Sequence, residues 1–446
     1  MTFTSKLLIT VLVLFGCVAV GNAYLNPAPR AMPAADTMDR VKPGLGPKNF
    51  AAAMAALDKS VLAAGQRADR QPGSWLNHEG LARAHLSRYR LSGNYDDLVL
   101  AGAAIQLGQD AAPKGSGPLL TRAIFQITTH QLNGLSGVLQ QMQGFAVAPG
   151  ADEQAEALAI AGDAEFFSGR YADAMIRYNE AAAKQDGAGI AIRIGRLHQK
   201  TGRPDLAIAS FVRAAKIEKS PTPQFLSSML LQIGVIELER GKWDAASKYF
   251  AKADARFPGF WLIQAHRAQM LAARGDHAAA QKAYLQILAD RPVAEVMDAL
   301  AGIYRLEGKA LPSKAWAARA KAIWQQRLAV LPDAAYGHAI DHELMLGDPK
   351  LALDLAQKNN VARPNGDSTI LLAWAMIANN QPAAARDILT VNNNTGWVSA
   401  QQHAALSQAY AMLGDSKSSI TEREAAAKLN PMIFDPAAPL IWFGHH

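Results

Sequence analysis

Small and apolar residues recur along the chain with the spacing expected of paired helices. The clearest unit is AIAGDAEFFSGRYADAMIRYNEAAA, residues 159–183. Its first helix should end near Gly169, because glycine readily adopts the left-handed conformation of a helix end, and its second should begin at about Tyr171. Gly162 is small where two helices must cross closely, and Tyr178 fills the space between them. The pattern therefore predicts a helical hairpin.

Eight units of this kind follow one another. An anchor residue in the first helix, small in all but one unit, marks them: Gly162, Gly195, Gly234, Ala268, Ala301, Ile340, Ala373 and Ser407. Successive anchors lie 33 to 39 residues apart, and a turn residue follows seven positions after each: Gly169, Gly202, Gly241, Gly275, Gly308, Gly347, Asn380 and Gly414. A period of about 34 residues is typical of stacked helical hairpins, so the fold is predicted to be all-α.

These units resemble the tetratricopeptide repeat family, over about Ala155 to Pro431. The resemblance implies a right-handed α-solenoid of tetratricopeptide-like helical hairpins, and residues 151–431 are assigned to them. Residues 49–150 are predicted to form diverged helical hairpins, beginning with a helix that Asn49 caps and Gly65 ends. The unit at Ala301 departs most from the pattern, because Pro312 lies where its second helix should run.

Both ends of the chain differ from the repeats. Residues 1–23 read as a secretory leader or anchor, with Lys6 before an apolar stretch and a cleavage site after Ala23. Retention as an anchor and lipidation at Cys17 are the alternatives. Residues 24–48 form a Pro/Gly-rich linker, predicted to be a tether. Residues 432–446 are predicted to be a capping tail that folds back over the last hairpin.

Composition narrows the classes of function. The 446 residues are 50% hydrophobic and 7% aromatic, with a formal net charge of +7. The basic residues are scattered among acidic ones, so we expect protein or peptide partners and no nucleic acid. A membrane would be contacted only through residues 7–23, if the leader is not cleaved. Cys17 is the one cysteine, so no disulfide framework is expected.

Motifs for catalysis or cofactor binding are not found in the sequence. It contains no glycine-rich phosphate loop, no paired cysteines and no nucleophile elbow, so neither an enzyme nor a cofactor is expected. The alternative is an accessory metal-handling protein or enzyme that uses His338 and His342, which lie four residues apart on one helix face. Two surface or groove imidazoles are the simpler interpretation, because two-ligand patterns are common in helices.

The family resemblance also implies a partner-binding surface, a concave groove lined by the first helices of the hairpins. Its groove positions correspond here to Phe166, Arg196, Lys200, Gln269, Arg305, Trp374 and Gln408. For Phe166 and Trp374, burial between repeats is the alternative. The Lys and Asn pairs by which some family members clamp a terminal carboxylate are missing. The expected function is a non-enzymatic protein–protein interaction scaffold of the bacterial cell envelope, in the periplasm or anchored to the membrane, that binds peptide or helical segments.

Overall fold

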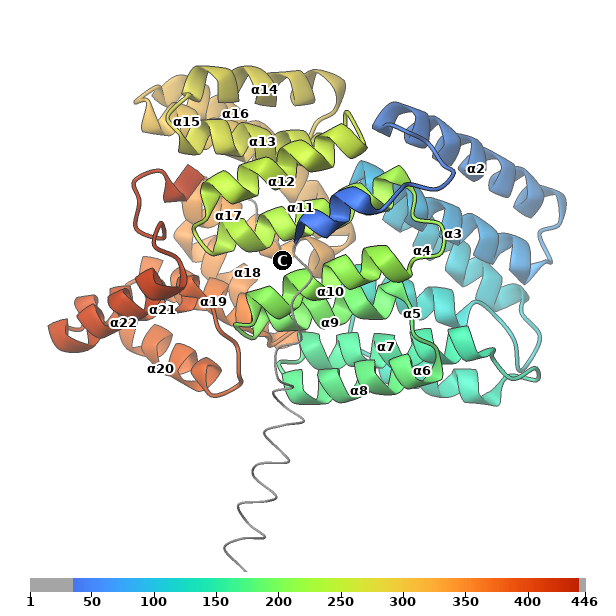
Figure 1. The fold of residues 1–446 in the computed structure, drawn as a ribbon. Coiled ribbons are helices and arrows are strands. Elements are labelled where there is room, and N and C mark those ends of the chain that lie inside the picture. The colour runs from blue at the N-terminus through green and yellow to red at the C-terminus, as the bar shows by residue number, and fades with distance from the viewer. Residues whose placement is uncertain (1–34, 441–446) are drawn as a thin grey trace, which may run out of the picture.

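The computed structural model describes residues 35–440, which form helices joined by short turns without a β-strand in that range. The predicted leader lies outside these residues. Between residues 35 and 440, no helix combines the length and the apolarity needed to cross a bilayer. The helices follow each other as antiparallel hairpins (Figure 1).

Eight hairpins follow the predicted repeat. Their helices are α7 (Ala151–Phe167) with α8 (Tyr171–Lys184), α9 (Ala188–Lys200) with α10 (Pro204–Ile217), α11 (Pro223–Glu239) with α12 (Trp243–Arg256), α13 (Trp261–Ala273) with α14 (His277–Asp290), α15 (Ala294–Leu306) with α16 (Ala310–Val330), α17 (Pro332–Leu346) with α18 (Pro349–Ala362), α19 (Gly366–Ala378) with α20 (Pro382–Asn393), and α21 (Ala400–Met412) with α22 (Ser416–Leu429). The all-α hairpin array predicted from the sequence is confirmed.

The anchor and turn residues explain the hairpin geometry. A Cβ at Gly234 would lie 2.5 Å from the Phe250 ring, so only glycine permits this crossing of α11 and α12. Six of the turn glycines have positive φ, and Asn380 takes the same conformation with φ of 58°. Gly347 is an exception with φ of −118°, because Asp348 begins the next helix at once by capping Lys350.

The second helix of the Ala301 unit is regular, although the sequence predicted an interruption. Helix α16 runs unbroken from Ala310 to Val330. Pro312 lies in its first turn, where a missing N–H leaves no intrahelical hydrogen bond unmade. Trp324 is buried within the hairpin and fills the place of the usual aromatic side chain.

The N-terminal region contains α2 (Phe50–Arg70), α3 (Trp75–Ser92), α4 (Tyr95–Ala111), α5 (Leu119–Thr128) and α6 (Leu135–Gln141), followed by the short 3₁₀ helix η2 (Met142–Gly144). Asn49 caps α2 as predicted, since its side chain accepts a hydrogen bond from the Ala52 N–H at 2.8 Å. The prediction that Gly65 ends this helix is wrong. No neighbouring atom approaches Gly65, and a glycine inside a helix costs only about 1 kcal/mol.

Part of the predicted linker is packed against the repeats. The 3₁₀ helix η1 (Ala35–Arg40) lies on α10 and α11, and Met38 is buried there in an apolar cluster. The Gly44 N–H donates to the Pro221 carbonyl at 2.7 Å, and Lys252 pairs with Asp39 at 2.8 Å. The expectation of a free tether is therefore wrong for residues 38–44, because apolar burial and backbone hydrogen bonds hold them.

The solenoid closes on itself around α7–α9 and α19–α21 (Figure 1). Thr201 forms a parallel bridge with Val398, and the Val398 N–H donates to the Lys200 carbonyl at 3.0 Å. The Gly366 N–H donates to the Tyr171 hydroxyl at 2.8 Å. Closure brings together hairpins that are about 200 residues apart in sequence.

Further N-terminal helices take part in this closure. The Tyr95 hydroxyl donates to the Ala334 carbonyl at 2.8 Å, and the Trp261 indole N–H donates to the Leu91 carbonyl at 3.2 Å. Helices α3 and α4 thereby contact α13 and α17, which belong to the middle of the repeat array. The array is therefore a compact closed superhelix and not an open arc.

The C-terminal tail packs only in part where predicted. After α22 the chain turns back past Gly241, and the short 3₁₀ helix η3 (Ala438–Leu440) contacts α13 and α15. Leu440 is buried in the apolar cluster of α13–α15. The prediction of a cap over the last hairpin is therefore wrong for Leu440. Phe434 does pack on that hairpin, since the Arg423 guanidinium of α22 lies 3.9 Å from its ring centroid. Residues 441–446 lie outside the described range.

Candidate functional site

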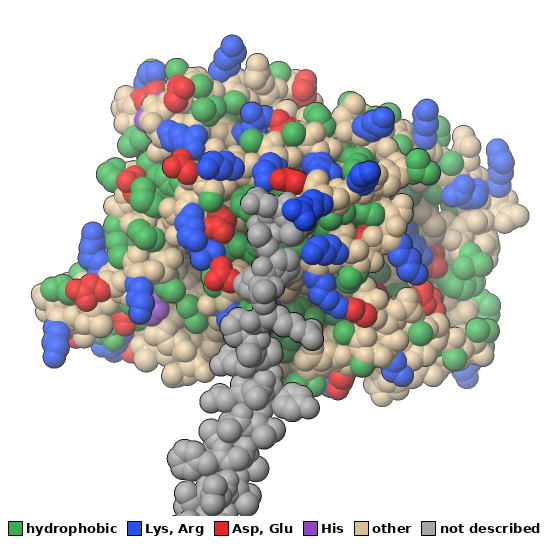
Figure 2. Space-filling model, viewed as in Figure 1, with side chains coloured by type: hydrophobic (Ala, Val, Ile, Leu, Met, Phe, Trp, Pro, Cys, Tyr) green, Lys and Arg blue, Asp and Glu red, His purple; other side chains and the backbone are tan. Residues whose placement is uncertain are grey.

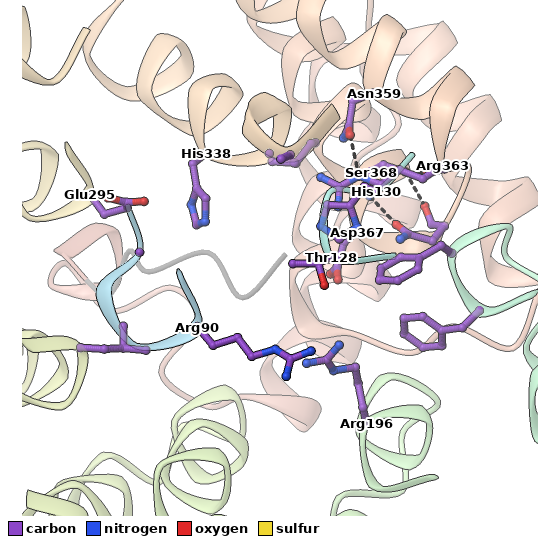
Figure 3. Close-up of a pocket in the computed structure, with 18 of the residues that line it drawn as sticks. Arg90, Thr128, His130, Arg196, Glu295, His338, Asn359, Arg363, Asp367 and Ser368 are labelled. Carbon is purple, nitrogen blue, oxygen red and sulfur yellow. Dashed lines mark hydrogen bonds between the residues drawn. The ribbon is translucent and has the colours of Figure 1, made fainter. Parts of the chain in front are cut away.

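A cavity of about 360 Å³ lies inside the closed superhelix, and we call it the chamber (Figure 3). Its wall comes chiefly from the first helices of the hairpins, α3, α7, α9, α11, α13, α15, α17 and α19. Aromatic residues such as Phe260 and Trp261 alternate there with charged and amide side chains. The first helices thus face inward, as the resemblance implies.

The chamber is rich in cationic groups. Four cationic side chains line it, Arg90, Arg196, Lys200 and Arg363, against two carboxylates, Glu295 and Asp367. Both carboxylates already have partners: Asp367 pairs with Lys200 at 3.3 Å, and Glu295 pairs with Arg327 at 2.8 Å. The remaining arginines carry charge that no carboxylate of the wall neutralises at ion-pair distance.

Arg90 and Arg196 extend into the chamber from different helices (Figure 3). Arg90 is in the last turn of α3 and Arg196 is on α9. Neither guanidinium forms a hydrogen bond or an ion pair within residues 35–440. Arg90 remains accessible to water, yet burial by the surrounding wall lowers its pKa, which the more distant Glu156 partly offsets. Two free guanidinium groups in one cavity form a site for an anion.

Arg363 adds a buried third group at the C-terminal end of α18. Its side chain is 3% exposed, and its Nε donates to Asn359 Oδ1 at 2.7 Å. Burial lowers the pKa of Arg363 to about 10, so the group stays charged at neutral pH. Asn359 also lines the chamber, and its Nδ2 is buried without a hydrogen-bond acceptor, which is uncommon in folded proteins.

Lys200 contributes both to the closure of the superhelix and to the wall of the chamber. It lies between Asp367 at 3.3 Å and Glu239 at 3.5 Å, with its ammonium 5.4 Å from the Trp397 ring centroid. Burial lowers the pKa of Lys200, but the two carboxylates outweigh this and raise it above its ordinary value. Lys200 is therefore charged and engaged, and it is less available to a ligand than Arg90 or Arg196.

The two histidines of the metal alternative do not form a common site. His342 is 1% exposed, and its Nδ1 lies 2.6 Å from Asp298 Oδ1. His338 stacks on Trp324 with ring centroids 5.7 Å apart and borders the chamber. No cluster of three or more metal-ligating side chains occurs in the part of the chain that the structure describes. His338 borders the chamber as expected of a groove imidazole, whereas this interpretation is wrong for His342, which is buried at hydrogen-bond distance from Asp298.

The predicted partner-binding residues divide into two groups. Arg196 and Lys200 line the chamber, and Phe166 borders it although its ring is 5% exposed and packs against Tyr171 and Trp397. Gln269 is fully buried and hydrogen-bonds His266 at 3.0 Å, so the expectation that it faces a groove is wrong.

The other three predicted residues lie outside the chamber wall. Arg305 donates to the Met345 carbonyl, Trp374 packs half-buried in the cluster of α19–α21, and Gln408 is exposed on α21. One concave face therefore does not unite all seven residues. Their role in partner binding stays a prediction.

Sequence reasoning missed Arg90, Arg363 and Asn359. Arg90 lies in a hairpin whose repeat pattern is degenerate, so no groove position could be transferred to it. Arg363 and Asn359 belong to a second helix and its end, which in an open array would face away from the groove. Only closure of the superhelix brings these residues to Arg196.

Two other hollows are larger but more open. One of about 660 Å³ lies along α12, where Lys252 and Arg274 pair with Asp39 and Asp244. The other, of about 780 Å³, separates α3 and α4 from the turn between α14 and α15 and from α16. Lysine and arginine side chains on the face drawn in Figure 2 are interspersed with acidic and apolar ones. The chamber differs from these surfaces because three of its four cationic side chains, Arg90, Arg196 and Arg363, have no carboxylate at ion-pair distance in the described part of the chain.

The comparisons with known proteins give only a general likeness. Neither a protein-family model nor a curated protein matches the chain. A tetratricopeptide repeat protein from Parabacteroides merdae ATCC 43184 is similar with a TM-score of 0.33 and 13% identity, covering 57% of this chain and 98% of that one. The Cut9–Hcn1 hetero-tetramer of the APC/C is similar with a TM-score of 0.32 and 14% identity, covering 92% of this chain and 96% of that one. A Rap protein complexed with Competence and Sporulation Factor is similar with a TM-score of 0.42 and 10% identity, covering 70% of this chain and 96% of that one.

The fold assignment rests on this chain's own features. Eight consecutive hairpins, their buried anchors and their left-handed turn residues recur at the period found in the sequence. Their first helices line an interior cavity. The chain is a tetratricopeptide-like α-solenoid.

Proposed function

We propose that this protein is a non-enzymatic protein–protein interaction scaffold of the bacterial cell envelope. The observation that carries the proposal is the chamber, a polar and aromatic cavity lined by the first helices of successive hairpins. Aromatic and arginine side chains of this kind tend to supply most of the binding energy at protein interfaces. Export is supported by the sequence pattern of residues 1–23 alone.

The chemistry of the chamber wall favours an extended segment of the partner over a helix. Amide and hydroxyl side chains such as Gln199, Gln232 and Thr128 line it, whereas a helix has already satisfied its own main-chain groups. A few residues in extended conformation can bond their main-chain groups to the amide and hydroxyl groups of the wall.

The test places a photo-reactive amino acid in the chamber and, as a control, outside it. Gln232 on α11 lines the chamber, whereas Gln401 on α21 is exposed and does not. Irradiation of intact cells should cross-link a specific protein from position 232 and not from position 401. The adduct should be found in the envelope fraction, with the scaffold chain beginning at Tyr24.

Other outcomes would contradict parts of the proposal. Cross-linking from position 401 alone would place the partner on the outer surface. No specific adduct from position 232 would argue against a chamber that holds protein. Recovery of the chain in the cytoplasm with Met1 intact would remove the envelope location, and a start at a modified Cys17 would indicate a lipoprotein.

A further inference from the structure

Charge inside the chamber is not balanced by the chain itself. Arg90 and Arg196 have no ion-pair partner in the described part of the chain, and the buried Arg363 is held only by a neutral amide. By contrast, the partly buried Arg193 and Arg88 have carboxylate partners: Arg193 binds both Glu156 and Asp163, and Arg88 binds Asp97. Arg90 and Arg196 are exposed and Arg363 is buried, so an anion in the chamber would form ion pairs that the chain itself does not supply.

We propose that the chamber is a binding site for carboxylates, and that its ligand is a short extended peptide segment carrying at least two acidic side chains. The inference rests on the proposed function and names the chemistry of the partner. The three guanidinium groups come from α3, α9 and the end of α18. One anion can lie between Arg90 and Arg196, which point toward one another in Figure 3, so a ligand that also reaches Arg363 needs a second anionic group.

The geometry of guanidinium groups explains the choice of carboxylate. Each guanidinium presents planar N–H donors that match the two oxygens of a carboxylate and bind them through parallel hydrogen bonds. Phe260 and Trp261 provide apolar surface in the same chamber for the methylene groups of an acidic side chain. Asn359 Nδ2 is a further donor that lacks an acceptor.

This site differs from a clamp built from lysine and asparagine on successive repeats. Arg90 comes from the degenerate hairpin before the repeats, and Arg363 from the end of a second helix. The site is complete only in the closed superhelix, because α3 contributes to it together with α9 and α18. Opening the closure would therefore separate the ligand-binding groups.

The experiment measures binding of a capped peptide, acetyl-Glu-Ala-Glu-amide, to the full chain by calorimetry at low and at physiological salt. The wild-type protein should bind it saturably, and more weakly at the higher salt concentration. The Gln-Ala-Gln analogue should bind at least about tenfold more weakly, because it lacks both carboxylates. Citrate added as a competitor distinguishes the source of the carboxylates. Displacement by citrate shows that a free small acid suffices, and failure to displace shows that the peptide backbone is required.

Variants assign the binding to the chamber. Arg90→Gln with Arg196→Gln should weaken binding of the Glu peptide at least about tenfold. Arg90→Lys with Arg196→Lys should give an affinity between that of this variant and that of wild type, because lysine keeps the charge but loses the planar pair of N–H donors. The matched control is Arg67→Gln with Arg70→Gln, which removes the same charge from exposed positions on α2. This control should bind within about twofold of wild type.

Stability of the unliganded protein gives an independent readout. Removing two unpaired cations should leave the thermal midpoint of the Arg90→Gln, Arg196→Gln variant unchanged or higher, whereas loss of a structural side chain would lower it. Absence of saturable binding, equal binding of the glutamine peptide, full binding by the double variant or a lower midpoint would each overturn the inference. Cross-linking from position 232 that persists without peptide binding would leave the scaffold function standing.

Discussion

Trp397→Ala is expected to lower the free energy of unfolding by about 3–5 kcal/mol, the usual cost of deleting a large aromatic side chain from a core. The indole is 2% exposed and lies between the Phe166 and Tyr171 rings, at centroid distances of 6.3 and 5.4 Å. It also leaves no room for a Cβ at Gly366. The truncation creates a cavity at the contact between α7–α8 and α19–α21, where the superhelix closes.

Urea denaturation followed by circular dichroism measures this effect. Leu311→Ala is the control, because Leu311 is 82% exposed on α16 and its truncation should change stability by no more than about 0.5 kcal/mol. A loss below about 1 kcal/mol in Trp397→Ala would mean that the indole is not enclosed between the two sets of hairpins.

Asp298→Ala should also destabilise the fold by about 3–5 kcal/mol, since it breaks a buried polar network. Asp298 is fully buried and accepts hydrogen bonds from the Trp324 indole at 2.8 Å and from His342 at 2.6 Å. Burial raises the pKa of Asp298, while these two hydrogen bonds act in the opposite direction. Alanine leaves both donors without an acceptor in the interior.

Asp244→Ala is the control for Asp298→Ala, because it makes the same substitution at an exposed position. Its carboxylate is 89% exposed and pairs with Arg274 at the surface, so its loss should cost less than about 1 kcal/mol. Equal effects of the two substitutions would contradict the structural role of the network. Metal bound stoichiometrically by wild type after dialysis and lost in His342→Leu would instead favour the metal-handling alternative.

The repeats were predictable because their determinants are local. Gly234 and Phe250 lie in one hairpin, and Asn380 replaces glycine at a turn where either residue tolerates positive φ. A period read from the sequence therefore predicted the hairpins and their order. The direction in which the first helices face was implied by the resemblance to the tetratricopeptide repeat family.

Closure could not be predicted, because it depends on contacts between distant hairpins. Gly366 and Trp397 belong to the seventh and eighth units, and they pack on Tyr171 of the first. Nothing in the spacing of the repeats specifies this contact, since the small rotation between hairpins accumulates along the array. The chamber, and with it Arg90 and Arg363, follows from closure and was missed for the same reason.

The central claim is that the solenoid closes and thereby forms the chamber, and a cross-link across the closure tests it most directly. Thr201 and Val398 are bridge partners that are 197 positions apart. Thr201→Cys with Val398→Cys, in a Cys17→Ser background, should react with a short bifunctional thiol reagent to give an intramolecular product at high yield. The pair Thr201→Cys with Leu311→Cys should not, because Leu311 lies on α16 away from this bridge. Cross-linking of the first pair with native helix content is the predicted result, and a first pair that reacts no better than the second would contradict a closed superhelix.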